Sequence, residues 1–186
     1  DSLSKSGLNY FDLVLIHWPM GHDLDTWRAL EEAYKAGKTR AIGISNFNSR
    51  QTLELINHAE IRPMVDQIET HLLLQQWKMH EFLKKENIIH ESYGPLGNGQ
   101  QNLMTNPVLQ KIGEKYGKSP IQVILRYLVQ NDIVTIPRST NPAHIKANID
   151  IFDFELDKED LKQVRALDER KPIDGWPAEM REDEDY

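Results

Sequence analysis

Several polar side chains of this sequence stand where short apolar runs end. The apolar run at residues 13–16 is followed directly by His17. Comparable runs along the chain end on a hydroxyl beside an amide, an amide near a carboxylate, a tyrosine, and a cation beside a hydroxyl: Ser45 with Asn46, Gln67 with Glu69, Tyr93, and Arg138 with Ser139. Each of these groups can hydrogen-bond a ligand or hold a charge. The pattern raises the question of whether they share one site.

Each residue has a plain structural explanation when it is taken alone. A histidine at a strand end can be a hydrogen-bonded boundary residue, and Ser45 and Asn46 are good helix caps. Gln67 can be a buried amide, and Tyr93 a packing aromatic before a turn. Five polar strand ends together are harder to explain in this way, because ligands of parallel α/β folds gather at the carboxyl ends of strands. We therefore predict that these ends face a site.

The elements that would position these residues alternate along the chain. Apolar spacing predicts helices at about residues 49–58, 75–86, 107–116 and 119–130, another around residues 27–34, a short one from about 142, and a last one capped by Asp157. Strands separated by helices require a parallel sheet, and two strand runs are apolar on both faces. The sequence therefore predicts five strand-helix units of an α/β domain at residues 1–175, with a tail at residues 176–186.

The composition argues against several classes of protein. Lys and Arg number 22 against 29 Asp and Glu, a net charge of -7, and no basic stripe suggests a nucleic-acid partner. Cysteine is absent, which removes disulfides, thiolate catalysis and most structural zinc sites. No apolar stretch approaches the ~20 residues of a membrane span. We expect a cytoplasmic protein without a nucleic-acid or membrane partner.

Metal and nucleophile motifs are also missing. Pro19 and Gly21 separate His17 from His22 and break the helix that a zinc pair at i, i+4 needs. No G-x-S-x-G elbow is present, and PLGNGQ lacks the lysine of a phosphate-binding loop. We predict no metal site.

A family resemblance runs through nearly the whole chain. YFDLVLIHWP, GKTRAIGISNF, VDQIETH, SYGPLG and YGKSPIQVILRYLVQNDIVTIPRSTNPAHIKANIDIFDFEL resemble successive blocks of the aldo-keto reductase family, in its order and at its separations. The resemblance implies a (β/α)8 TIM-type barrel, of which this chain would hold about five units, strands 4 to 8. It also implies an enzyme that reduces aldehydes or ketones to alcohols with NADPH.

The resemblance gives roles to the first strand ends. His17 matches the histidine that hydrogen-bonds the substrate carbonyl, and Trp18 matches a residue of the substrate pocket. Tyr93 would stack on the nicotinamide ring, as a flat aromatic suits a flat ring. Three hydroxyl and amide side chains, of types that recognise a carboxamide, would hold the nicotinamide carboxamide: Ser45, Asn46 and Gln67.

Four further residues would lie along the phosphates. Gly94 and Leu96 belong to the segment beside the pyrophosphate, although the family more often has Ser in place of Gly94. Arg138 and Ser139 fall where the family binds the adenosine 2′-phosphate. A cation beside a hydroxyl suits a phosphate, so NADPH is expected over NADH.

The adenine end departs from the family pattern. His144 stands where an Arg usually packs over the adenine, and Ala147 stands where a Glu often contacts it, whereas Asn148 keeps the family's amide. A histidine is mostly neutral at neutral pH unless a phosphate raises its pKa. We expect looser NADPH binding than is usual for the family.

The family's barrel begins with three further strand-helix units, which supply an Asp, a Tyr and a Lys. Of the four catalytic residues, only His17 is present here. General acid catalysis is typically worth ~10²–10⁴ in rate, so the chain alone should be a poor reductase. Its open strand edges would favour self-association, whereas the full-length enzyme would be a monomer.

Two hypotheses remain for the function. In the first, the chain is the C-terminal part of an NADPH-dependent aldo-keto reductase acting on a small carbonyl substrate. In the alternative, it is a truncated, catalytically silent member of the family that binds a nucleotide or a partner.

Overall fold

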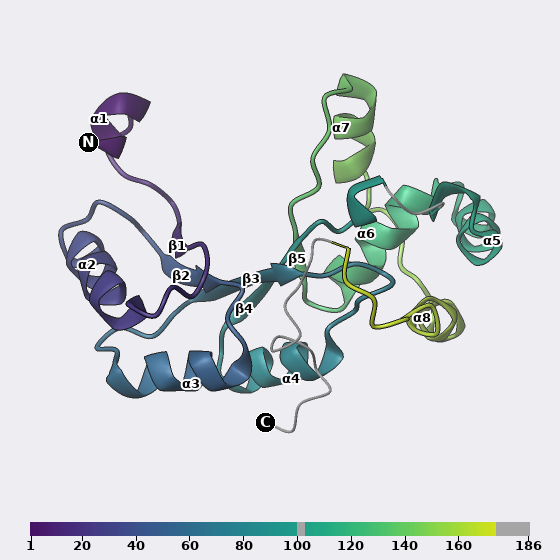
Figure 1. Ribbon diagram of the computed structural model, residues 1–186. Helices are drawn as coiled ribbons and strands as arrows, with labels where there is room; N and C mark the ends of the chain where they lie inside the picture. The colour runs from purple at the N-terminus through teal and green to yellow at the C-terminus, as the bar shows by residue number, and fades with distance from the viewer. Residues whose placement is uncertain (100–102, 174–186) are drawn as a thin grey trace. The chain divides into compact units, whose positions relative to one another are not determined.

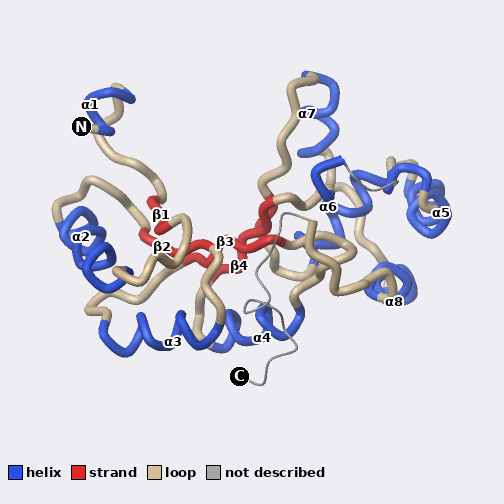
Figure 2. Tube along the Cα trace, viewed as in Figure 1, coloured by secondary structure: helices blue, strands red, loops and turns tan. Residues whose placement is uncertain are grey.

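The sheet of this protein consists of five parallel strands. The computed structural model describes residues 1–99 and 103–173, so the predicted tail at 176–186 lies outside the described residues. The strands follow one another in chain order (Figure 1; red in Figure 2): β1 Val14–Ile16, β2 Ile42–Ser45, β3 Val65–Glu69, β4 Ile89–Tyr93 and β5 Val134–Thr135. The predicted parallel α/β sheet is therefore confirmed.

Helices separate the strands, as the sequence predicts. Their bounds are α1 Ser2–Ser6, α2 Asp23–Lys35, α3 Ser49–His58, α4 Trp77–Lys85, α5 Pro107–Tyr116, α6 Pro120–Gln130, α7 Pro142–Ile149 and α8 Lys158–Arg165. Short 3-10 turns lie at Gly97–Gly99 and Leu103–Thr105. The described chain forms two compact units, one of residues 1–68 and 78–90 and the other of residues 69–77 and 91–173.

The core of the first unit forms around β2. All four residues of β2 are buried, as expected for a strand that is apolar on both faces. Trp27 of α2 and Leu55 of α3 belong to the same apolar cluster as Ile42 and Ile44. The indole nitrogen of Trp27 donates a hydrogen bond to the main-chain oxygen of Ile61 at 2.9 Å, so its polar atom is satisfied inside the core.

A glycine allows the three strands of this unit to approach one another. A Cβ atom on Gly43 of β2 would lie 2.6 Å from the main-chain oxygen of Val65 and 2.6 Å from Cδ2 of Leu15. Real Cβ atoms are not found so close to other atoms. The register pairs Leu15 with Gly43 and Ile44 with Asp66, so this glycine sits at the centre of the unit's sheet.

The first strand is less buried than its sequence suggests. Only Ile16 of β1 is buried, while Val14 and Leu15 are half-buried. In the described chain β1 stands at the edge of the sheet, with β2 as its neighbour. The apolar run at residues 13–16, which its composition predicts to be buried throughout, is therefore buried only at Ile16.

The second unit is built around α6. Seven consecutive residues of α6, from Gln122 to Leu128, are buried. Leu109 of α5 and Val164 of α8 belong to the same apolar cluster. The helix starts with a capping box in which Ser119 and Gln122 hydrogen-bond each other's backbone amides.

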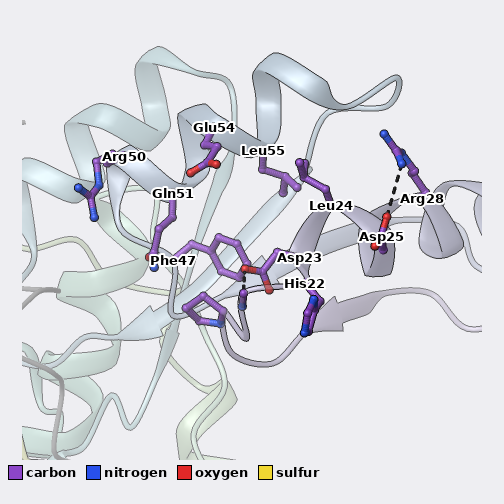
Figure 3. A pocket seen from close by; sticks show the side chains of 12 residues that line it. His22, Asp23, Leu24, Asp25, Arg28, Phe47, Arg50, Gln51, Glu54 and Leu55 are labelled. Atoms are coloured by element: carbon purple, nitrogen blue, oxygen red, sulfur yellow. Dashed lines mark hydrogen bonds and ion pairs between the residues drawn. The ribbon is translucent and has the colours of Figure 1, made fainter.

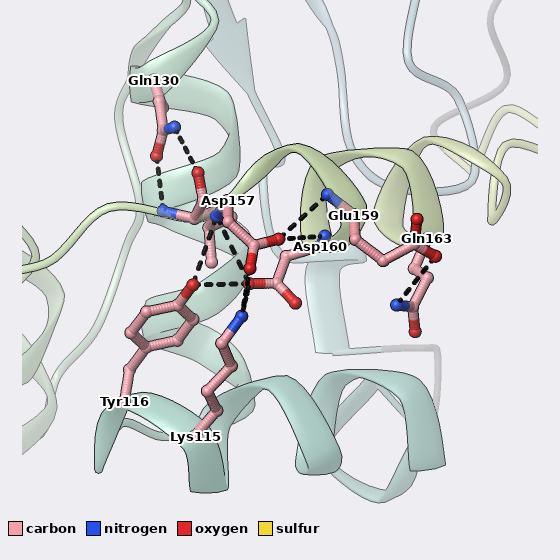
Figure 4. Close-up of polar contacts among 8 residues, drawn as sticks. Lys115, Tyr116, Gln130, Asp157, Glu159, Asp160 and Gln163 are labelled. Carbon is pink, nitrogen blue, oxygen red and sulfur yellow. Dashed lines mark hydrogen bonds and ion pairs between the residues drawn. The ribbon is translucent and has the colours of Figure 1, made fainter.

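A charged cluster joins α5 to the start of α8 (Figure 4). Asp157 caps α8, as predicted, by accepting hydrogen bonds from the amides of Glu159 and Asp160 at 2.9 Å. Lys115 of α5 donates to Asp157 and, at 2.8 Å, to Asp160, and the hydroxyl of Tyr116 donates to Asp160. The Lys115 ammonium, together with the backbone amides, lowers the pKa of Asp157 to about 2.

Candidate functional site

Ser45 and Asn46 connect the ends of β1 and β2 to the middle of β3 in the first unit. The hydroxyl of Ser45, at the end of β2, donates to the main-chain oxygen of Gln67 on β3 at 2.7 Å. The backbone amide of Asn46 donates to the same oxygen at 3.0 Å. Its side-chain Nδ2 donates to the main-chain oxygen of His17, directly after β1, at 3.0 Å. The structure thus brings these four predicted residues together.

Asn46 is held in this place at an energetic cost. Its φ of 63° lies in the left-handed region, which asparagine enters more readily than most residues but less readily than glycine. Its side chain is 1% exposed, and among the described residues its Oδ1 has no hydrogen-bond partner. An unsatisfied buried acceptor costs roughly 1–3 kcal/mol. Strained backbone and unsatisfied buried polar atoms are common at ligand sites. A hydrogen-bond donor of the ligand can satisfy Oδ1 of Asn46.

The imidazole of His17 is accessible while its backbone is fixed. His17 is exposed, and its main-chain oxygen accepts the hydrogen bond from Asn46. Trp18 is half-buried, and its ring centroid lies 6.3 Å from that of His17 with the planes tilted by 57°. The pair presents a polar ring and an apolar ring side by side.

A hollow of the first unit opens between α2 and α3 (Figure 3). It has a volume of about 510 Å³ and is lined by residues that include Phe47, Arg50 and Glu54. The carboxylate of Asp23 fixes its edge by accepting from the amides of Met20 and Gly21 at 2.8 and 3.3 Å. None of the predicted site residues lines this hollow.

In the second unit, Tyr93 leads into a tight turn. Tyr93 is half-buried, and its main-chain oxygen accepts from the amide of Thr70 at 3.2 Å. The amide of Gly97 donates to the oxygen of Gly94 at 2.8 Å, and Gly94 has a φ of 60°. A glycine adopts this φ without the strain that a serine would meet.

A cavity of about 830 Å³ follows this turn. Four of the predicted cofactor residues are among those that line it: Gly94, Leu96, Arg138 and Ser139. Arg138 is exposed, and within the described ranges no ion pair engages its guanidinium. The cavity therefore combines backbone turns with an available cation and a hydroxyl, a set that suits a phosphate.

The predicted adenine residues lie apart from the residues that line this cavity. His144 is exposed and Asn148 is half-buried, and both are on α7, a helix without buried residues. Neither lines the cavity. Their proposed contacts with adenine stay predictions.

The sequence interpretation missed the burial of two acids on β3, Asp66 and Glu69. Oε1 of Glu69 lies 3.0 Å from Nε2 of His71 and accepts from the amide of Ile173 at 2.6 Å. Asp66, beside Gln67, is fully buried. The two acids in VDQIE carry no local signal of this burial, because acids on strands are usually exposed.

Two further findings concern the described residues as a whole. Within residues 1–99 and 103–173, no three His, Asp or Glu side chains are grouped so that they could hold a metal ion. In the same part of the chain, no helix is long and apolar enough to cross a membrane.

Comparison with known proteins then identifies the family. The sequence profile described as the aldo/keto reductase family matches residues 1–169. The chain belongs to the aldo/keto reductase family. Glyoxal reductase of Bacillus subtilis (strain 168) is 48% identical over 181 residues, which is 96% of this chain and 64% of that protein. This aldo/keto reductase chain spans 60 to 64% of the length of the first curated relatives that it matches.

Solved structures of aldo-keto reductases have the same fold. MGS-M4, an aldo-keto reductase from a Medee basin deep-sea metagenome library, superposes with a TM-score of 0.91 at 43% identity, covering 100% of this chain and 68% of its own. An aldo-keto reductase of Bombyx mori in complex with NADP gives 0.86 at 34% identity, covering 92% of this chain and 62% of its own. The (β/α)8 fold class predicted for this aldo/keto reductase chain is thereby confirmed, with five of the strands present.

Proposed function

We propose that this chain is part of an NADPH-dependent reductase that converts small aldehydes or ketones to alcohols. The observation that carries the proposal is the buried Oδ1 of Asn46, which has no partner among the described residues and lies at the joined strand ends. NADPH, when bound, supplies the hydride that reduces the carbonyl carbon. The NADP complex of the Bombyx mori relative and the name of the Bacillus subtilis glyoxal reductase support this assignment.

The hydrogen-bonding capacity left at the strand ends suits a carboxamide. Both hydrogens of Asn46 Nδ2 are used, by the oxygen of His17 and by Ser45 Oγ, so only its Oδ1 acceptor is left. The Ser45 hydroxyl donates to Gln67 and accepts from Asn46, which leaves one lone pair. Two acceptors match the two hydrogens of a carboxamide NH2, and the side-chain amide of Gln67 would donate to its oxygen.

The second unit would hold the phosphate end of the cofactor. Arg138 and Ser139 line the cavity of about 830 Å³ beside the Gly94 turn, and they would bind the 2′-phosphate that distinguishes NADPH from NADH. Tyr93 would stack on the nicotinamide ring. His144 and Asn148 would meet the adenine more loosely, because α7 buries none of its residues.

His17 would act on the substrate. Its exposed imidazole would donate a hydrogen bond to the carbonyl oxygen and so polarise the carbonyl. Trp18 beside it would contact the rest of a small substrate. The Asp, Tyr and Lys that the family resemblance implies would come from residues outside this sequence, and the Tyr would give the proton to the oxygen.

NADPH binding tests the role of Asn46. In Asn46→Gly the left-handed backbone is retained and the side chain is removed, so we expect the dissociation constant, measured by NADPH fluorescence, to rise at least about tenfold. Asn87→Gly is the matched control, because Asn87 is exposed and has a φ of 57°. Equal affinity of the Asn46 variant and the wild type would remove Asn46 from the site.

Turnover tests the reductase itself. The protein is purified as its own cell makes it, its intact mass is determined, and NADPH oxidation is followed with glyoxal as the substrate. We expect an intact mass above that of these 186 residues and turnover by that longer protein. Its His17→Ala variant should lose most of the turnover, and the 186 residues alone should show little. NADPH binding without turnover by the longer protein would favour the silent nucleotide-binding alternative.

A further inference from the structure

The segment that follows α8 is fastened to the loop that follows β3. Within the second unit, the amides of Glu169 and Lys171 both donate to the main-chain oxygen of Leu73, at 3.1 and 2.9 Å. The side chain of Asp168 accepts from the amide of Gln75 at 3.3 Å. These bonds fix the first part of the segment, and the position of the chain two residues further on depends on a separate contact.

That contact is made by Glu69, the last residue of β3. Oε1 of Glu69 accepts a hydrogen bond from the amide of Ile173 at 2.6 Å. Pro172 has no amide hydrogen, so the amide of Ile173 is the next main-chain donor after that of Lys171. Glu69 is 0% exposed, and a hydrogen bond to a buried acceptor is stronger than one that competes with water.

His71 fixes the direction of the Glu69 carboxyl group. Nδ1 of His71 accepts from the amide of Leu73 at 3.3 Å, so the proton of the neutral ring is on Nε2. Nε2 lies 3.0 Å from Oε1 of Glu69 and donates to the same oxygen that binds Ile173. His71 is 1% exposed, and its main chain exchanges two hydrogen bonds of 3.0 Å with Leu74. The acceptor for Ile173 is therefore held by a rigid partner.

The bond between Glu69 and Ile173 lies at the carboxyl end of a parallel strand. In (β/α)8 barrels the active site is built at these strand ends. A chain bound to the last side chain of β3 is therefore expected at the rim of the site. Residues 168–173 include none of the residues proposed to act on the carbonyl or the cofactor, so their position should affect substrate binding more than the chemical step.

We propose that Glu69 is a positioning residue of the reductase, which holds the chain at Ile173 beside the carboxyl end of β3 so that residues 168–173 border the substrate. The substrate part of this inference rests on the proposed function. The anchoring part needs no ligand, because hydrogen exchange of the Ile173 amide measures it directly.

Two substitutions of Glu69 separate anchoring from simple burial. Glu69→Gln keeps a side-chain oxygen that can accept from both His71 and Ile173, whereas Glu69→Leu keeps a similar size and removes every acceptor. Asp160→Leu is the matched control, because Asp160 is another buried acid of the second unit, and its side-chain partners are on α5. This control should lower stability and keep the acceptor of Ile173.

Hydrogen exchange of the longer protein without ligand gives the first readout. We expect Glu69→Leu to lower the protection factor of the Ile173 amide about tenfold or more. The Lys171 amide, which is bonded to Leu73 instead, should stay near wild type. Glu69→Gln should restore most of the protection at Ile173. A loss shared equally by both amides, as a general loss of stability in Asp160→Leu would produce, or no loss at all, would overturn the anchoring role.

Steady-state kinetics of the longer protein with NADPH and glyoxal gives the second readout. We expect Glu69→Leu to raise KM for glyoxal about fivefold or more with little change in kcat, and Glu69→Gln to stay near wild type. A lower kcat with an unchanged KM would overturn the positioning of the substrate. Loss of protection at Ile173 in a protein that reduces no carbonyl with NADPH would keep the anchor and refute the proposed function.

Variants of the donor decide the matter if Glu69→Leu does not fold. Ile173→Pro removes the amide hydrogen and leaves the buried acid in place, whereas Ile173→Ala shortens the side chain and keeps the amide. We expect Ile173→Pro to raise KM as Glu69→Leu would, and Ile173→Ala to raise it less. Equal KM values for the two variants would overturn the positioning role.

Discussion

Replacing Gly43 with alanine should destabilise the first unit, because Gly43 lies at the centre of its sheet. The added methyl group would stand 2.6 Å from the main-chain oxygen of Val65 and 2.6 Å from Cδ2 of Leu15, with Cβ of Val65 at 3.1 Å. Leu15 can turn away, because it is half-buried. The oxygen of Val65 belongs to β3 and can move only if the strand moves.

The expected destabilisation follows from these contacts. Overpacking by one methyl group typically costs 1–3 kcal/mol, against a gain of about 0.5–1 kcal/mol from replacing glycine in a strand. Because one clash is with backbone, we expect a net loss of about 2 kcal/mol, which lowers the ratio of folded to unfolded protein by a factor of about 30. For a chain of this size the melting temperature should fall by roughly 4–8 °C.

Urea unfolding followed by circular dichroism measures this loss. Gly37→Ala serves as the control, because a Cβ there meets no atom within 4 Å and the expected penalty is only that of its φ of 69°. Adding Leu15→Ala to Gly43→Ala should restore none of the lost stability, since Leu15 can turn away by itself and the clash with the main-chain oxygen of Val65 remains. If Gly43→Ala were as stable as the wild type, the close approach of the three strands in this unit would be refuted.

Two further predictions concern charged groups. The pKa of Asp157 is lowered from 3.8 to about 2, chiefly by Lys115, so its ion pair stabilises the fold above about pH 3.8 and the stabilisation is lost as the pH falls toward 2. Asp157→Asn should therefore flatten the acid limb of a plot of urea midpoint against pH, and an unchanged limb would contradict the lowered pKa. Arg138→Ala should weaken NADPH binding about tenfold or more and leave NADH binding nearly unchanged, as measured by fluorescence titration. An equal loss for both cofactors would exclude Arg138 from contact with the 2′-phosphate.

The parts of the fold that the sequence predicts well are those with local causes. The cap at Asp157 is predicted from the residue type ahead of an apolar pattern, and it forms a capping box with Asp160. The alternation of strands and helices also follows from local apolar spacing. The half-exposure of Val14 and Leu15 does not, because it depends on which strand lies beside β1.

In the candidate site, too, the sequence predicts the features that have local causes and misses those set by distant residues. The residue types at strand ends predict that His17, Ser45 and Asn46 lie together, because parallel strands end at the same edge. Their actual connection, from Asn46 Nδ2 to a main-chain oxygen 29 positions earlier, has no local pattern. The complete burial of Asp66 is likewise set by distant residues, and a single acid between Val65 and Gln67 gives no sign of it.

The burial of seven consecutive residues in α6 also matters while the chain is being made. Val164, which belongs to the cluster around this helix, leaves the ribosome about 35 residues after Leu128, a delay of roughly 2–7 seconds at ordinary rates of translation. During that interval the apolar sides of α6 lack the covering of α8. A nascent chain halted there would present this helix to chaperones or to other chains, so the pace of synthesis over this stretch affects the yield of folded protein.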